Sequence, residues 1–181
     1  MYTGEKVRLR EYRKEDAPKA QAYINDPEIK RLLGGAPFPL TLWDEEKFIT
    51  QQSARSDNYS FAIETIANGH YIGGCGINAL DWKNRVVEIG IFIGDKSYWN
   101  QGYGTDALKV LLRFVFDQLN MHKVNLRVLS FNGRAQKVYR RLGFREEGRL
   151  RQERYVDGGY YDLVIMGLLK EEYGQTTKES L

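Results

Sequence analysis

The sequence predicts a single domain of the α/β (α+β) class, in which helices flank a mixed, mostly antiparallel sheet. In the first half of the chain, alternating and β-branched runs surround Asn68-Gly69, a dipeptide typical of tight hairpins. The second half alternates strand and helix patterns. The length of 181 residues, with 42% apolar and 28% charged residues, is typical of one globular domain.

The N-terminal part of the chain predicts one strand followed by short helices. Residues 7–12 alternate apolar and polar side chains, as a strand with one buried face does. Residues 16–24 and 27–33 are each predicted as a short helix, because a proline is tolerated in a first helical turn. Glycines and prolines mark residues 33–40 as a loop, and helical spacing returns over residues 44–54.

Strand patterns dominate the middle of the chain. Residues 59–65 and 71–79 lie on either side of Asn68-Gly69, whose residues accept the positive φ of a hairpin turn. Residues 86–94 form a nearly continuous β-branched and aromatic run. Such a run predicts a central strand that is covered on both faces.

The last third of the chain alternates helices and strands. Residues 102–119 carry an apolar stripe at helical spacing, residues 124–130 have strand character, and residues 132–142 predict a helix that ends before a glycine. Two short strands complete the predicted domain, near residues 144–147 and 160–170.

Charge and composition exclude several classes of protein. The net charge of +3 is interspersed along the chain, which argues against a dedicated nucleic-acid binder, although denser basic residues between Arg134 and Arg154 would suit a polyanion. Cys75 and two histidines are too few soft ligands for a usual zinc site, and one cysteine fits a reducing compartment. The longest apolar run, residues 163–169, is far shorter than the roughly 20 residues of a membrane helix. We expect a cytoplasmic protein with no metal, nucleic-acid or membrane partner.

The first candidate motif is the glycine-rich segment from Trp99 to Thr105, between a buried strand and a long helix. Glycines let the backbone approach a ligand, and the free N–H groups at a helix start favour a pyrophosphate. The alternative is a turn that only packs the helix against the sheet. Gly102-x-Gly104-x-x-Ala107 also matches a dinucleotide fingerprint, but the next strand lacks the acidic residue which that fingerprint requires.

The second candidate motif runs from Asn132 to Phe144. Asn132 is a natural helix N-cap, and Tyr139 lies about two turns further along nearly the same face. A phenol with a pKa near 10 stays protonated at neutral pH, so it can donate a proton to a leaving group. The alternative is a half-buried tyrosine that packs beside Leu142.

These two segments, in this order and about 30 residues apart, resemble the GCN5-related N-acetyltransferase (GNAT) superfamily. The resemblance is strongest to the branch with ribosomal-protein N-terminal and spermidine acetyltransferases. It covers about residues 6–170 and leaves residues 171–181 as a polar tail. The family pattern Gln/Arg-x-x-Gly-x-Gly/Ala falls on Trp99-x-x-Gly102-x-Gly104, so Trp99 departs from the general pattern, although aromatic residues are usual there in this branch.

The resemblance implies acetyl-CoA as the acetyl donor and assigns the residues that hold it. The pyrophosphate would bind the backbone amides of residues 101–105, and the pantetheine arm would extend the sheet beside the strand that ends near Ile93. Asn132 would lie near the pantetheine arm and Tyr139 near the thioether sulfur. The implied donor-binding residues are Ile91, Phe92, Ile93, Gln101, Gly102, Tyr103, Gly104, Thr105 and Asn132.

Glu88 is a candidate catalytic base. It interrupts the apolar run of residues 86–94, where an unpaired carboxylate would be costly and its pKa would rise. A base that takes a proton from an ammonium group needs such a pKa. The alternative is a structural ion pair with Arg85, Arg127 or another cation.

The predicted function is direct acetyl transfer from acetyl-CoA to a primary amine, with Tyr139 and Glu88 as catalytic residues. A non-catalytic acyl-CoA-binding sensor on the same fold is the competing hypothesis. The acceptor stays open between a protein N-terminus, a polyamine and another small amine. The lack of excess acidic residues favours an N-terminus or a small amine over a polyamine. A homodimer is compatible with the sequence.

Overall fold

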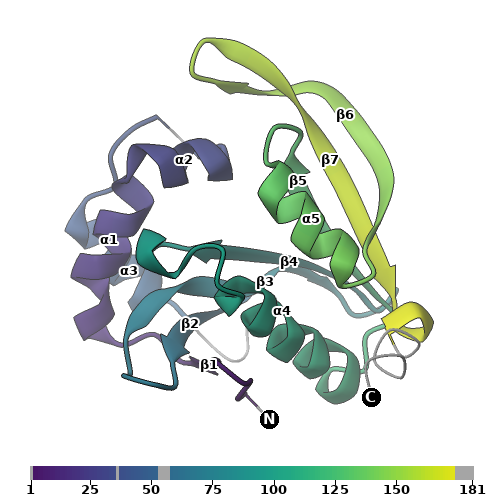
Figure 1. The fold of residues 1–181 in the computed structure, drawn as a ribbon, viewed down its shortest axis with the longest axis horizontal. Coiled ribbons are helices and arrows are strands. Elements are labelled where there is room, and N and C mark those ends of the chain that lie inside the picture. The colour runs from purple at the N-terminus through teal and green to yellow at the C-terminus, as the bar shows by residue number, and fades with distance from the viewer. Residues whose placement is uncertain (1, 36, 53–57, 174–181) are drawn as a thin grey trace.

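A computed structural model describes residues 2–35, 37–52 and 58–173 of the chain (Figure 1). One seven-stranded sheet has the order β1-β2-β3-β4-β5-β7-β6, and helices cover its two faces. Only β4 and β5 pair in parallel, and every other neighbouring pair in this sheet is antiparallel. The sheet is therefore mixed and mostly antiparallel, as the sequence predicted.

The first arm of the sheet consists of four antiparallel strands and the short helices that follow the first of them. The turn after β2 contains Asn68-Gly69, where Gly69 has a φ of 68°. The elements are β1 (Val7–Arg10), η1 (Lys14–Asp16), α1 (Ala17–Asn25), α2 (Pro27–Leu33), α3 (Leu42–Thr50), β2 (Tyr59–Thr65), β3 (Tyr71–Asp81) and β4 (Val86–Ile93).

The second arm follows β4 and alternates helices with strands. Its helix α4 continues into a π-helical turn, η3, before the chain enters β5. The elements are η2 (Lys96–Tyr98), α4 (Tyr103–Arg113), η3 (Phe114–Gln118), β5 (Lys123–Leu129), α5 (Gly133–Arg141), β6 (Arg145–Val156) and β7 (Gly159–Leu169).

Helices α1 and α4 pack on opposite faces of the sheet. In β2, Ala62 packs with Ala20 of α1. The next residue, Ile63, instead belongs to the largest cluster of buried apolar residues, which includes those of α4. Because neighbouring side chains in a strand point to opposite faces, α1 and α4 cover different faces. Tyr139 and Leu142 join the same core cluster as α4, which places α5 on the α4 face.

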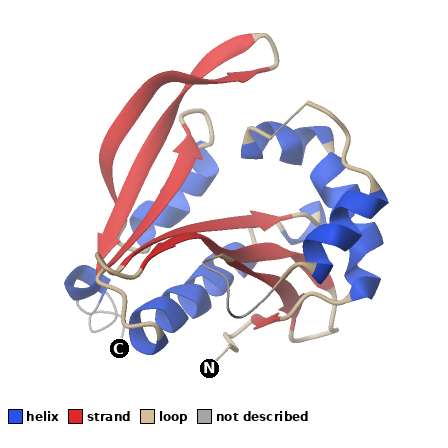
Figure 2. Cartoon of the chain, turned by 180° about the vertical axis from the view of Figure 1, so that it is seen from behind, coloured by secondary structure: helices blue, strands red, loops and turns tan. Residues whose placement is uncertain are grey.

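The parallel pairing of β4 with β5 ends after three residues. It joins Val86 to Lys123, Val87 to Val124 and Glu88 to Asn125, and no further pair follows. Beyond this point β5, β6 and β7 swing away from β1–β4, as Figures 1 and 2 show. The backbone of β4 from Ile89 to Ile93 therefore has no strand beside it on the β5 side.

Asp106, in the first turn of α4, ties that helix to the N-terminal strand. Its carboxylate accepts hydrogen bonds from the amides of Glu5, Lys6 and Val7 at 3.1, 2.8 and 3.0 Å. An acidic side chain is also stabilised near a helix N-terminus by the helix dipole. The position of the α4 N-terminus is thus fixed against β1.

Several elements differ from their predicted extents. The strand predicted over residues 7–12 ends at Arg10, and the helix predicted over residues 44–54 runs over Leu42–Thr50. The helix predicted over residues 102–119 ends as an α-helix at Arg113, and residues 114–118 form the π-helical turn. The strand predicted near residues 144–147 is longer, because β6 runs over twelve residues. Nearly all of β6 is exposed, and pairing with β7 rather than burial holds it in place. Its charged sequence accordingly lacks the apolar alternation by which a strand is recognised.

Ordered structure continues for a few residues beyond β7. Residues 170–173 form a helical turn. Tyr173 stacks on Phe116 with ring centroids 4.9 Å apart. Residues 174–181 lie outside the described part of the chain, as do residues 53–54 of the helix predicted over 44–54.

Candidate active site

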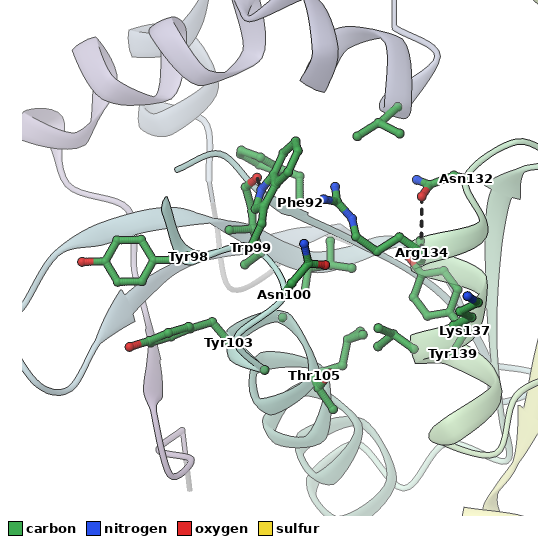
Figure 3. A pocket seen from close by; sticks show the side chains of 18 of the residues that line it. Phe92, Tyr98, Trp99, Asn100, Tyr103, Thr105, Asn132, Arg134, Lys137 and Tyr139 are labelled. Carbon is green, nitrogen blue, oxygen red and sulfur yellow. Dashed lines mark hydrogen bonds between the residues drawn. The ribbon is translucent and has the colours of Figure 1, made fainter. Parts of the chain in front are cut away.

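A cavity of about 720 Å³ lies where β4 and β5 separate (Figure 3). Its walls come from α2, β4, the loop before α4, the first turns of α4, and α5. Ile91 and Ile93 pack toward the α4 face, whereas Phe92 points to the opposite face of the strand. Because all three residues line the cavity, it reaches both faces of the sheet through the gap between the strands.

The α4 N-terminus presents backbone amides to this cavity. Gly102 precedes the helix with a φ of 84°, a conformation that favours glycine, and no side chain caps the helix. The first amide with a helical acceptor is that of Asp106, which donates to the Gly102 carbonyl at 2.9 Å. The earlier amides, those of Tyr103, Gly104 and Thr105, are open to an anion.

Trp99 anchors the loop before α4. Its indole N–H donates to the Ile93 carbonyl at 2.8 Å, which fixes the loop to the end of β4. The guanidinium of Arg134 lies 3.8 Å from the Trp99 ring centroid, in the geometry of a cation–π contact. This contact brings the first turn of α5 to the loop before α4, and Figure 3 shows both side chains at the cavity.

Asn132 caps α5 and also lines the cavity. Its side-chain oxygen accepts from the Ala135 amide at 3.2 Å, which is the N-cap geometry predicted from the sequence. Gln136 is buried and donates to the carbonyls of Leu129 and Ser130 at 3.2 and 3.0 Å. These contacts fix α5 to the end of β5.

Tyr139 lies on α5 with its side chain at the cavity (Figure 3). The ring is 8% exposed and packs edge-on against Phe144, with centroids 6.0 Å apart. Burial raises the pKa of Tyr139 to about 12, because the phenolate would lose its hydration. The phenol is thus protonated at neutral pH, as a proton donor must be.

Helix α2 closes the cavity on the side opposite α4. Ile29, Leu32 and Leu33 contribute apolar side chains to the lining. The helix begins with Asp26 as its N-cap, whose carboxylate accepts from the Glu28 and Ile29 amides. At its other end Arg31 lies over the Phe131 ring, 4.5 Å from the centroid. Helix α2 therefore spans the gap between the two arms of the sheet.

Comparison with known proteins establishes the family. The model of the acetyltransferase (GNAT) domain family matches residues 6–145. This chain belongs to the GNAT family. It is 30% identical to the Bacillus licheniformis protein "Uncharacterized N-acetyltransferase p20" over 96% of this chain and 97% of the relative. It is 28% identical to the spermidine N(1)-acetyltransferase of Escherichia coli (strain K12), over 96% of this chain and 91% of the relative.

A solved structure has the same fold. The spermidine N-acetyltransferase from Vibrio cholerae, in complex with CoA and spermine, superposes with a TM-score of 0.84 at 24% identity. The alignment covers 92% of this chain and 97% of that structure. The curated relatives are named N-acetyltransferases, and this GNAT domain is an enzyme of that class.

Two residues predicted for the site do not line the cavity. The carbonyl of Gln101 accepts from Lys6 Nζ at 2.8 Å, and the Gln101 side chain donates to the Ser97 carbonyl. Glu88 forms an ion pair with Arg127, whose Nε lies 2.9 Å from Oε2. The structure thus contains the Arg127 pair that the sequence left as an alternative for Glu88. The catalytic role of Glu88 stays a prediction.

Sequence reasoning missed several residues of the GNAT cavity. Helix α2 was predicted, but nothing in its local pattern indicated that it would line a site. Arg134 and Lys137 also line the cavity, and the only signal for them was the density of basic residues after residue 134. A basic first turn on a helix next to a glycine-rich motif could have identified both.

Three further observations concern metal groups, the cysteine and membrane helices in the described part of the GNAT domain. In the described residues, no group of three or more His, Cys, Asp or Glu side chains could hold a metal ion. Cys75 is buried, and burial raises the pKa of its thiol above the ordinary value, which favours the neutral thiol. Across the described ranges, no helix combines the length and apolar character that a membrane crossing requires.

Proposed function

We propose that this protein transfers the acetyl group of acetyl-CoA directly to a primary amine. One observation carries the proposal: a single cavity joins the open amides of α4, the unpaired edge of β4 and the protonated Tyr139. A CoA thioester needs all three, namely an anion site, an extended groove and a proton donor near its sulfur.

The residues of the cavity fit acetyl-CoA. The pyrophosphate would bind the amides of Tyr103, Gly104 and Thr105, where the helix dipole favours an anion. Arg134 and Lys137 supply positive charge at the same cavity. The pantetheine arm carries two amide groups, which can pair with the free backbone edge of β4 as a neighbouring strand would.

Acetyl-CoA supplies the acetyl thioester, and the protein supplies orientation and proton transfer. The amine nitrogen forms a bond to the carbonyl carbon while the carbon–sulfur bond breaks. Tyr139 donates its proton to the departing sulfur, which leaves as the thiol. Open amides of β4 beside the gap would hold the carbonyl oxygen as its negative charge grows. A positioned acid of this kind contributes about 10²–10⁴-fold in rate.

Glu88 is the proposed acceptor of the proton that the ammonium group loses. Its side chain lies on the same face of β4 as Phe92, which lines the cavity on the α2 side. Its side chain is 26% exposed, so water can connect its carboxylate to the amine. The alternative is that Glu88 only forms a structural ion pair with Arg127.

Thiol release from acetyl-CoA in the presence of primary amines tests the proposed function. We expect thiol release that depends on the amine and an acetylated product of the corresponding mass. A sensor would bind acetyl-CoA, raise the melting temperature and release no thiol with any amine. That result would contradict the proposal.

The variants Glu88→Gln and Arg127→Gln separate the two roles of Glu88. If Glu88 is the base, Glu88→Gln should lower turnover and remove the acid-side limb of the pH–rate profile. Arg127→Gln should keep that limb. If Glu88 only pairs with Arg127, both variants should lose similar stability, and both should keep the pH–rate profile of the native protein. Melting temperature and turnover, measured over the same pH range, decide between the two.

A further inference from the structure

The cavity has two chemically different sides. The α4 and α5 side carries open amides and the basic residues Arg134 and Lys137. The α2 side carries the aliphatic chains of Ile29, Leu32 and Leu33, and Phe92 of β4 lies on the same face of the sheet as α1. If acetyl-CoA occupies the basic side, the amine must approach from the apolar side.

No acidic side chain lines this cavity among the residues that the structure describes. Four carboxylates, in α2 and its N-cap, in β4 and in the turn before β7, are each paired with a cation. These ion pairs are Glu88 with Arg127 at 2.9 Å, Asp157 with Arg31 at 3.1 Å, and Asp26 and Glu28 with Lys96 at 2.8 and 2.9 Å. A ligand with several positive charges would therefore find its potential partners already neutralised.

The chain stays uncharged in the segment that follows α2. Residues 32–43 contain no charged side chain. Beyond Leu33, which is 45% exposed at the cavity, this segment exposes Phe38 and Trp43 by 77% and 73%. Of this segment, Leu32 and Leu33 line the cavity, where exposed apolar residues are typical of a binding surface. This surface complements an uncharged, apolar group.

We propose that the acceptor is a primary amine carried by an apolar group, and not a polyamine. The inference rests on the proposed function and specifies its substrate class. A polyamine would keep one or more ammonium groups next to aliphatic side chains, and burial of an unpaired charge is costly. An aliphatic or aromatic group beside the reacting amine instead buries apolar surface against α2, which is favourable. A small arylalkylamine and a peptide with an apolar first residue both carry a primary amine next to an apolar group.

Specificity constants for four acceptors test this inference. The acceptors are phenylethylamine, two tetrapeptide amides that begin with leucine and with serine, and spermidine, each at saturating acetyl-CoA. We expect kcat/KM for phenylethylamine or the leucine peptide to exceed that for spermidine at least about tenfold, the usual effect of an apolar contact in a pocket. The first two acceptors distinguish a small amine from a peptide N-terminus. The leucine and serine peptides isolate the apolar side chain.

Two variants with a matched control connect this preference to the residues. Leu33→Glu places a carboxylate at the cavity, and we expect about a tenfold lower kcat/KM for the apolar acceptor. Trp82→Glu makes the same change at a residue that is 57% exposed in the turn between β3 and β4, outside the cavity, and should leave kcat/KM unchanged. Lys96→Met removes the cation that pairs with Asp26 and Glu28, so kcat/KM for spermidine should rise.

The possible outcomes separate this inference from the proposed function. A higher kcat/KM for spermidine than for both apolar acceptors, or equal effects of Leu33→Glu and Trp82→Glu, would overturn the inference and leave the acetyl transfer intact. No gain for spermidine in Lys96→Met would contradict the argument from paired carboxylates. A native protein whose melting temperature does not respond to acetyl-CoA would instead contradict the proposed function.

Discussion

Helices α4 and α5 both begin at the cavity, but their first turns are completed in different ways. Gly102 leaves the first amides of α4 without a side-chain cap, whereas Asn132 caps α5 by accepting from the Ala135 amide. Helix α4 therefore offers backbone donors to a ligand, and α5 offers the side chains of Arg134 and Tyr139. An uncapped helix end is suited to binding an anion, and a capped one is a rigid support for reactive side chains.

The largest effect is expected at Tyr139, the reactive group on α5. Tyr139→Phe removes one hydroxyl and keeps the ring against Phe144, so turnover should fall about 10²–10⁴-fold with little change in stability. Because burial places the pKa of Tyr139 at about 12, the phenol should not limit the native rate below pH 10. Steady-state turnover of the native protein and of Tyr139→Phe, measured at several pH values, tests both the loss of rate and the pH dependence.

A matched change on an exposed tyrosine provides the control. Tyr155 is 64% exposed on β6, outside the cavity, and Tyr155→Phe should leave turnover unchanged. Turnover of Tyr139→Phe within threefold of the native value would show that this tyrosine only packs.

The second prediction concerns the amides of α4. A Cβ at Gly104 would lie 3.5 Å from Ile93, an ordinary van der Waals contact, and would place a side chain at the cavity. Acetyl-CoA at one hundred times its dissociation constant should stabilise the native protein by about 2.7 kcal/mol, or roughly 5–10 °C in melting temperature. Gly104→Val should abolish this shift. Gly148→Val, in β6 where a Cβ meets no atom within 4 Å, should keep it, and loss of the shift in both variants would count against the α4 site.

A smaller effect is expected at Arg134, which contacts the cavity from α5. The guanidinium is exposed, so its attraction for a phosphate group is screened by water and salt. Arg134→Ala should raise the acetyl-CoA dissociation constant roughly two- to fivefold, about 0.5–1 kcal/mol, and the difference should shrink in high salt. Titration calorimetry at two salt concentrations measures this. An equal change in Arg151→Ala, on the exposed strand β6, would indicate a general charge effect.

The smallest effect is expected from the α5 cap. Asn132→Ala removes the acceptor of the Ala135 amide and should lower the free energy of unfolding by about 1 kcal/mol, roughly 2–4 °C in melting temperature. Asn132→Asp keeps a capping oxygen and should retain most of the stability. Urea unfolding of the three proteins tests this. Equal stability of all three would mean that the cap contributes nothing measurable.

The sequence predicted the elements whose local pattern is strong. In the first arm, β1 was predicted from alternation, β2 and β3 from the hairpin dipeptide between them, and β4 from its continuous apolar run. Helices α4 and α5 were predicted from apolar spacing and terminal residues. The strand β6 was predicted too short, because its pairing with β7 rather than its own apolar pattern forms it.

The candidate site was predicted where it follows from motifs and missed where it depends on tertiary contacts. Glycine spacing indicated the α4 loop, and helical spacing put Asn132 and Tyr139 on one face. The partner of Glu88 could not be chosen between Arg85 and Arg127, since that choice depends on the register of β4 against β5. In the structure Arg85 donates to the Asn120 carbonyl, and Arg127 pairs with Glu88.

Amide chemical shifts provide the most direct test of the different roles of α4 and α5. We expect the open N-terminus of α4 to bind the CoA phosphates. In ¹H–¹⁵N spectra recorded during titration with CoA, the amides of Tyr103, Gly104 and Thr105 should therefore show the largest chemical-shift changes. The amide of Ala135, already bonded to Asn132, should change much less. Large changes at Ala135 with unmoved amides in the first turn of α4 would contradict the assignment of the CoA phosphates to α4.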